Sequence, residues 1–120
     1  MSTILVVDDY AVARRILSHT LQKNGHVVVG ASDGREALAR LDDTAVDLAI
    51  IDIAMPGMDG LTLLRHLRDR DAQKALPVIM LSASGQDEDR LIARDLGAHD
   101  FLSKPASSYE LLDAVGRLLA

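Results

Sequence analysis

Five short apolar runs alternate with five stretches of helical periodicity along this chain, and this alternation constrains the fold more than any other feature. The runs are rich in β-branched residues, and their alternation with helical stretches is the pattern of parallel strands joined by crossover helices. A chain of 120 residues is long enough to bury one core. The sequence therefore predicts an α/β fold, a single domain over residues 1–120 with a five-stranded, doubly wound parallel sheet and five helices.

Periodicity and capping signals place these elements. The predicted strands cover residues 4–7, 26–30, 47–51, 77–81 and 99–102. Three predicted helices cover about 11–24, 58–70 and 87–95, and two more include the apolar stretches within 37–41 and 111–119. Two pairs, Asp33 with Glu36 and Ser107 with Glu110, have the spacing of capping boxes and mark helix starts. In the third helix, we expect Leu61, Leu64 and Leu67 to face the sheet.

Polar residues follow the apolar runs where the predicted strands end. Asp8 and Asp9 follow the first run, Asp52 the third, Ser82 the fourth and Lys104 the fifth. Ligands of open parallel sheets bind beyond the carboxyl ends of the strands. We therefore expect these acids, this hydroxyl and this ammonium group to converge at one edge of the sheet.

Three carboxylates at one point repel each other, and burying them together is costly unless a cation or protons compensate. The available ligands are hard oxygens and the chain has no cysteine, so Mg²⁺ is the expected metal, with Mn²⁺ as a substitute. Asp52 could then attack a phosphoryl group, while Lys104 and Ser82 contact its oxygens. Taken singly, these residues have ordinary alternatives: Asp9 could cap a helix, Ser82 could bond its own turn, and Lys104 could lie in a solvated corner.

Composition excludes several other functions. The net charge of −5 argues against direct nucleic-acid binding by this domain, and an aromatic content of 2% supplies few stacking platforms. The apolar runs are far shorter than the roughly 20 residues that span a bilayer. The chain begins at Met1 without a basic leader or a signal-peptide pattern. We therefore expect a cytoplasmic protein that does not contact membranes.

Over its whole length the sequence resembles the response-regulator receiver domains of two-component signalling, which are CheY-like proteins. The segments that carry this resemblance are 4–9, 52–60, 82–84 and 104–105. The resemblance implies a flavodoxin-like sheet with strand order 2-1-3-4-5. It implies that Asp52 is the phospho-acceptor, that Asp8, Asp9, Asp52 and the backbone carbonyl of Ala54 bind Mg²⁺, that Lys104 binds phosphate, that Ser82 is the switch hydroxyl and that Pro105 follows a cis bond.

Phe101 occupies the position of the family's rotating aromatic residue, although an aromatic residue on a strand can also simply pack in the core. The resemblance further implies a phosphorylation-dependent switch in a two-component or phosphorelay system. A sensor histidine kinase or phosphotransfer protein would be the donor, and a downstream effector domain or target protein would receive the signal. The chain would catalyse only its own phosphorylation and dephosphorylation. It would work alone or as the N-terminal receiver of a longer regulator, with a possible phosphorylation-dependent homodimer through helix 4, strand 5 and helix 5.

Three alternatives remain open at this stage. A pseudo-receiver would bind partners without phosphorylation. A Mg²⁺-dependent phosphohydrolase would begin with the same chemistry, but Ala54 stands where its second acid belongs. A flavodoxin relative needs a phosphate loop after the first strand, where Asp8 and Asp9 would repel phosphate. The family's lifetime-tuning positions, Ala54 and Ser84, do not fix how long a phosphoryl group would survive.

Overall fold

The computed structural model describes residues 2–83 and 87–120. Its five parallel strands are ordered β2-β1-β3-β4-β5, which confirms the predicted topology. The strands are β1 (Thr3–Val7), β2 (Val27–Ala31), β3 (Leu48–Asp52), β4 (Val78–Ser82) and β5 (Asp100–Ser103). The helices are α1 (Ala11–Lys23), α2 (Gly34–Asp43), α3 (Gly60–Arg68), α4 (Asp87–Asp95) and α5 (Ser108–Leu119). Ser84, which belongs to one of the sequence segments that carry the family resemblance, lies outside the described residues.

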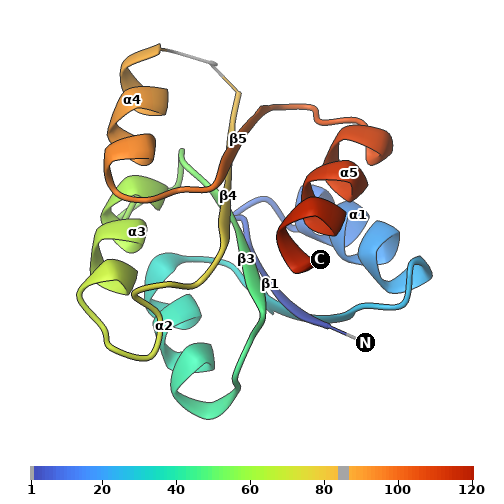
Figure 1. The fold of residues 1–120 in the computed structure, drawn as a ribbon, viewed down its shortest axis with the longest axis horizontal. Coiled ribbons are helices and arrows are strands. Elements are labelled where there is room, and N and C mark those ends of the chain that lie inside the picture. Colours follow the sequence, from blue (N-terminus) through green and yellow to red (C-terminus); the bar gives the residue numbers. More distant parts are fainter. Residues whose placement is uncertain (1, 84–86) are drawn as a thin grey trace.

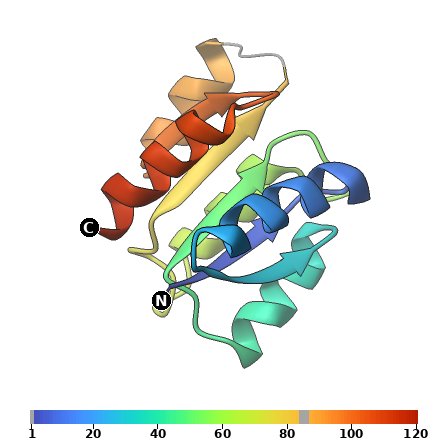
Figure 2. The same cartoon turned by 90° about the vertical axis from the view of Figure 1, so that its right-hand side faces the viewer.

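The helices cover both faces of the sheet, with α1 and α5 on one face and α2, α3 and α4 on the other (Figures 1 and 2). Because side chains alternate along a strand, each central strand contributes to two cores. One core joins the sheet to α2, α3 and α4 through residues such as Leu5, Ile51, Leu64 and Met80. The other joins it to α1 and α5 and includes Ile50. Burial on both faces explains why the strands read as continuous apolar runs.

The capping signals are confirmed in one case and corrected in another. The Ser107 hydroxyl accepts from the Glu110 amide and Glu110 accepts from the Ser107 amide, so this capping box is complete. At α2, Asp33 accepts from the Glu36 amide. The Glu36 carboxylate, however, accepts from the amide of Ser32, one residue before the N-cap. The predicted capping box of Asp33 and Glu36 is therefore only half formed, because the Glu36 side chain binds the amide that precedes the N-cap residue.

The third helix begins two residues later than predicted. Asp59 is its N-cap and accepts from the amide of Thr62, which places Met58 before the helix. Leu63 is fully buried together with Leu64 and Leu67, whereas Leu61 is only half-buried. Leu61 packs against the same core, so the predicted stripe of leucines is correct, and Leu63 is a further buried residue that the prediction did not include.

Glycines end two helices. Gly25 follows α1 and Gly97 follows α4, and both have positive φ angles, of 88° and 86°, which side chains disfavour. Within the described residues, no helix is both long and apolar enough to cross a membrane.

Candidate functional site

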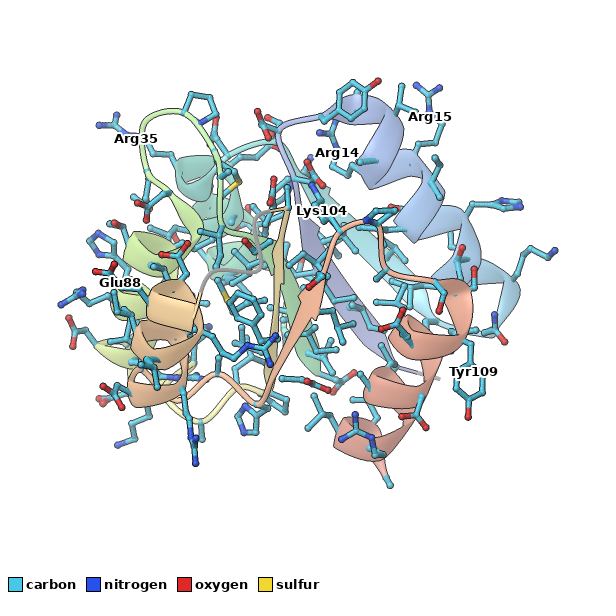
Figure 3. The ribbon with its side chains drawn as sticks, turned by 90° about the horizontal axis from the view of Figure 1, so that it is seen from above. Arg14, Arg15, Arg35, Glu88, Lys104 and Tyr109 are labelled. Carbon is cyan, nitrogen blue, oxygen red and sulfur yellow. The ribbon has the colours of Figure 1, made fainter. Side chains whose placement is uncertain are left out.

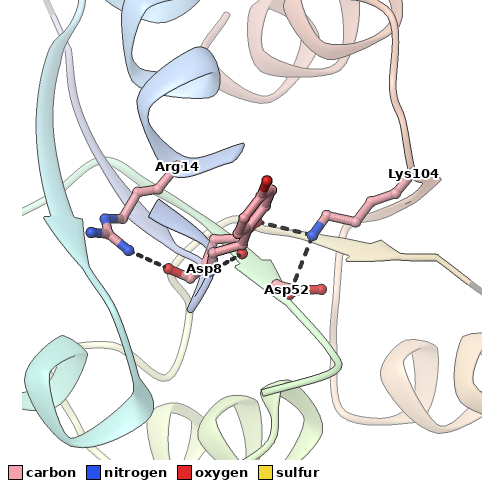
Figure 4. Close-up of polar contacts among 5 residues, drawn as sticks. Asp8, Arg14, Asp52 and Lys104 are labelled. Carbon is pink, nitrogen blue, oxygen red and sulfur yellow. Dashed lines mark hydrogen bonds and ion pairs between the residues drawn. The ribbon is translucent and has the colours of Figure 1, made fainter. Parts of the chain in front are cut away.

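The polar residues predicted to converge lie at the carboxyl edge of the sheet. Asp52 and Ser82 are the last residues of β3 and β4, and Asp8 directly follows β1. Lys104 follows β5 and points into the same region (Figures 3 and 4). The parallel arrangement brings these strand ends together, as the sequence analysis expected.

Three carboxylates form a cluster at this edge. One oxygen from each of Asp8, Asp9 and Asp52 lies within 4.8 Å of the others. Asp8 is fully buried and Asp52 is 4% exposed, whereas Asp9 is exposed. Asp9 does not cap α1, since the N-cap is Tyr10 and no side chain caps that helix. The ordinary alternative for Asp9 is therefore wrong.

Lys104 joins two of these carboxylates. Its ammonium Nζ lies 3.0 Å from Oδ2 of Asp8 and 3.3 Å from Oδ2 of Asp52 (Figure 4). Burial alone would lower the pKa of Lys104, but the hydrogen bond to Asp8 and the charge of Asp52 outweigh it and raise that pKa. Lys104 therefore stays an ammonium ion. The alternative that Lys104 lies in a solvated corner is wrong. The Lys104–Pro105 peptide bond is cis, the isomer that the resemblance implied.

Burial raises the pKa of the Asp52 carboxyl group, and the neighbouring Asp8 charge raises it further. The Lys104 charge and hydrogen bonds from Lys104 and the Ala54 backbone oppose this rise without cancelling it. The ionised Asp52 is thus held in an unfavourable environment, and a further cation beside it would relieve this cost.

Asp8 is bound through each of its polar groups. Its amide donates to the carbonyl of Ala31 at 3.1 Å. Its carboxylate accepts from the amide of Tyr10 at 2.9 Å and from Lys104. Its carbonyl oxygen accepts from Nη1 of Arg14 at 2.6 Å (Figure 4). The sequence analysis missed Arg14, because no local pattern signals a side chain that bonds a backbone carbonyl.

The turn after Asp52 packs closely against the start of α3. The amide of Gly60 donates to the carbonyl of Ile53 at 2.8 Å. A Cβ atom at Gly60 would lie 2.3 Å from the Asp52 carbonyl oxygen and 2.7 Å from the Ile53 Cα atom. Only glycine fits this approach, which holds Asp52 and the exposed Ala54 in place.

Ser82 is buried at 3% exposure, and its carbonyl oxygen accepts from the Lys104 amide at 2.9 Å. Ser82 pairs with Ser103 at the ends of the β4 and β5 strands. The structure thus places this hydroxyl-bearing residue on the strand beside Asp52, whose own partner is Leu81.

Phe101 is half-buried and packs against the core beneath α4. The Arg90 guanidinium group lies over its ring, 4.9 Å from the centroid, which is within the range of a cation–π contact. A cavity of about 300 Å³ adjoins this pair and is also lined by Ala93, Arg94, Ala98, His99 and Asp100. The rotation of Phe101 stays a prediction.

Arg68 is a second arginine that the sequence analysis missed. It donates to the carbonyls of Leu96, Gln73 and Gly97 at 3.0, 3.0 and 2.8 Å, which ties α3 to the end of α4. Burial lowers its pKa. Burial also lowers the pKa of His99, whose Nδ1 accepts from the Val78 amide, and the Arg68 charge adds to this effect.

The donor set suits a hard divalent cation. Three carboxylates gather in one place, and no histidine belongs to this group or to another metal-binding group within the described residues. The chain has no cysteine. Oxygen-only ligands favour Mg²⁺ or Mn²⁺ over zinc, so the site is compatible with magnesium.

The model of the response regulator receiver domain matches residues 4–116. The transcriptional regulatory protein CpxR of Klebsiella pneumoniae is 40% identical over 119 residues, which are 99% of this chain and 50% of that protein. The response regulator GtcR of Aneurinibacillus migulanus is 40% identical over 98% of this chain and 46% of its own length. The chain thus spans about half the length of these relatives. Among solved structures, the chemotaxis protein CheY4 of Vibrio cholerae has a TM-score of 0.95 and 36% identity over 99% of both chains.

Proposed function

Because the chain belongs to the response regulator receiver domain family, we propose that Asp52 is the residue at which this signalling switch is phosphorylated. One observation carries the proposal: the buried Asp52 carboxylate lies in a cluster with those of Asp8 and Asp9, and 3.3 Å from the Lys104 ammonium group. This arrangement offers a nucleophile, oxygen ligands for a metal and a cation for phosphate in one place.

In the transfer, an oxygen of Asp52 forms a bond to phosphorus as the bond from phosphorus to the donor breaks. The donor is the phosphohistidine of a sensor kinase or phosphotransfer protein, and the electron pair of the broken bond leaves with its imidazole. Burial raises the pKa of Asp52, which makes its carboxylate a better nucleophile, while the Lys104 charge opposes this rise. Lys104 and the Ser82 hydroxyl then contact the oxygens of the phosphoryl group.

Asp8, Asp9, Asp52 and the backbone carbonyl of Ala54 would hold Mg²⁺, or Mn²⁺ in its place. When bound, the metal neutralises charge that develops on the phosphoryl oxygens. The chain's own catalysis is limited to its phosphorylation and dephosphorylation, since Ala54 supplies no second acid for turnover of a general substrate.

Phosphorylation changes the binding surface through Ser82 and Phe101. The phosphoryl group draws the Ser82 hydroxyl inward, and Phe101 turns into the vacated space, which remodels the surface of α4, β5 and α5. The Arg90 guanidinium group over the ring must move with Phe101 or lose its contact. Aromatic NMR spectra with and without beryllofluoride, a phosphoryl mimic, test this step. A single unchanged Phe101 conformation contradicts it.

Response regulators act between histidine kinases and effector domains, and the named relatives include a transcriptional regulatory protein of about twice this length. We infer that this receiver works in the cytoplasm as a switch for an effector domain or target protein. A phosphorylation-dependent homodimer would use α4, β5 and α5, where Glu88, Arg90 and Arg94 are exposed. A mass in solution that stays monomeric with beryllofluoride excludes this dimer.

The direct test is the intact mass of the protein after incubation with Mg²⁺ and acetyl phosphate. We expect one phosphoryl adduct that requires the metal and disappears in Asp52→Asn. An adduct that persists in Asp52→Asn would place the acceptor elsewhere. If the wild-type protein forms no adduct and beryllofluoride does not bind, the chain is a pseudo-receiver.

A further inference from the structure

Arg14 reaches from α1 to the backbone of Asp8, which no local pattern in the sequence indicates. Its Nη1 donates to the Asp8 carbonyl oxygen at 2.6 Å (Figure 4). The stem of Arg14 lies over β2, where a Cβ atom at Gly30 would be 3.6 Å from its Cδ atom. The side chain is half-buried, and none of the described carboxylates forms an ion pair with it. Among the described residues, its guanidinium group therefore binds the main chain of Asp8 and no side-chain carboxylate.

The carboxylate of Asp8 and the main chain of Asp8 make separate hydrogen bonds, and metal binding would affect the two sets differently. Its carboxylate is bound to Lys104, at 3.0 Å, and this contact must be rearranged if the carboxylate is to hold a metal ion and Lys104 is to contact a phosphoryl group. Its main chain is bound to the Ala31 carbonyl and to Arg14, and neither bond occupies a carboxylate oxygen. The main-chain bonds can therefore persist while the carboxylate changes partners.

We propose that Arg14 is a positioning residue that fixes the Asp8 backbone and thereby sets the affinity of the carboxylate cluster for Mg²⁺. The inference rests on the proposed function, since it assumes that Asp8 is a metal ligand. Hydrogen bonds that orient a ligand commonly matter 10- to 100-fold for metal affinity, as a general estimate. Arg14 orients Asp8 through the β1–α1 connection, and it does not touch the metal itself.

The sign of the effect distinguishes positioning from simple charge. If Arg14 acted only as a nearby positive charge, its removal would strengthen Mg²⁺ binding, because a cation that repels Mg²⁺ would be gone. If Arg14 positions Asp8, its removal weakens Mg²⁺ binding despite this electrostatic gain. Arg14→Met keeps much of the aliphatic stem and removes both the charge and the hydrogen bond.

The neighbouring Arg15 is the matched control. It is exposed and makes no side-chain hydrogen bond or ion pair with the described residues. Figure 3 shows it pointing away from the body of the molecule, unlike Arg14 on the same helix. Arg15→Met therefore removes the same charge from α1 without removing a contact to Asp8.

The experiment is an NMR titration of each protein with MgCl₂, followed through the amide signals of residues 8–10 and 52–54. We expect the dissociation constant for Mg²⁺ to rise about 10-fold in Arg14→Met and to stay unchanged in Arg15→Met. Equal or tighter binding by Arg14→Met would overturn the inference. A rise of the same size in Arg15→Met would also overturn it, because a general effect of substitutions in α1, and not the contact to Asp8, would then explain both.

Arg14→Lys is a second variant, which tests the inference even if Arg14→Met does not fold. Lysine retains the charge, but its side chain is one atom shorter than the reach to Nη1, so it cannot restore the 2.6 Å contact without movement. We expect Arg14→Lys to bind Mg²⁺ more weakly than wild type, because it loses the contact to Asp8 and keeps the charge that repels Mg²⁺. Wild-type affinity in Arg14→Lys would refute positioning. A wild-type protein that binds no Mg²⁺ would instead refute the metal site on which the inference rests.

Discussion

Gly60→Ala tests whether the close approach between α3 and the turn after β3 positions Asp52, the proposed phosphorylation site. The added Cβ atom would lie 2.3 Å from the Asp52 carbonyl oxygen, which is 1.1 Å short of the 3.4 Å at which ordinary contact begins. The second neighbour, the Ile53 Cα atom at 2.7 Å, is also backbone, so no side-chain rotation relieves the overlap. The backbone at Asp52 must therefore move by roughly an ångström or α3 must retreat.

Overpacking of a buried position costs about 1–3 kcal/mol, and we expect the upper half of that range because both neighbours are backbone atoms. Urea unfolding should therefore show a loss of about 2–3 kcal/mol in the free energy of unfolding. A displacement of about 1 Å at a reacting group can cost 10²-fold in rate. The rate of adduct formation from acetyl phosphate, followed by intact mass, should fall by about that factor.

Gly116→Ala is the control for this change. Gly116 lies in α5, is exposed, and a Cβ atom there meets nothing within 4 Å. This substitution should raise the free energy of unfolding by about 0.5–1 kcal/mol through helix propensity and leave the adduct rate unchanged. If Gly60→Ala is as stable and reacts as fast as wild type, the close approach does not constrain the site.

Three further predictions concern charges. Because the folded protein holds the pKa of Asp52 above its ordinary value of 3.8, protonation favours the folded state, and the stability due to this group is lost as pH rises from that value through the folded pKa. Metal-free wild type should therefore lose stability relative to Asp52→Asn over this range in urea unfolding at stepped pH, and a constant difference would contradict the assignment. Lys104→Met leaves Asp8 and Asp52 without their shared cation, so the free energy of unfolding should fall by about 2 kcal/mol, and Mg²⁺ should restore more stability to this variant than to wild type. Arg68→Met removes three hydrogen bonds to the carbonyls of Gln73, Leu96 and Gly97 and should cost about 2–4 kcal/mol, whereas Arg65→Met, on the exposed side of the same helix, should cost under about 0.5 kcal/mol.

The sequence predicted the sheet well because its signals are local. Continuous apolar runs rich in β-branched residues identified each strand, and all five helices appear near their expected positions. The errors arise at helix starts, where a side chain binds a backbone amide other than the one that the pattern suggests. Asp59 caps α3 and displaces the expected start at Met58. Glu36 accepts from the amide of Ser32 instead of completing the capping box.

The site was predictable in the residues that follow strands and unpredictable in those that bind backbone carbonyls. Asp8, Asp9, Asp52 and Lys104 meet because parallel strands end at one edge, and a sequence pattern can indicate that edge. Arg14 and Arg68 donate to carbonyl groups, and every residue carries a carbonyl group. The sequence therefore does not indicate which carbonyl group an arginine will bind. The roles of Arg14 and Arg68 become clear only in the folded structure.

The charges at the carboxyl edge of the sheet also explain why a metal and Lys104 are complementary. The carboxylates of Asp8, Asp9 and Asp52 bring three negative charges, and Lys104 compensates one of them. Two negative charges remain, which equals the charge of one divalent cation. Burial raises the pKa of Asp52, and the Asp8 charge adds to this rise while Lys104 opposes it. Because the Arg14 guanidinium group is bound to a main-chain carbonyl, it leaves both Asp8 carboxylate oxygens available to a metal ion at the proposed site.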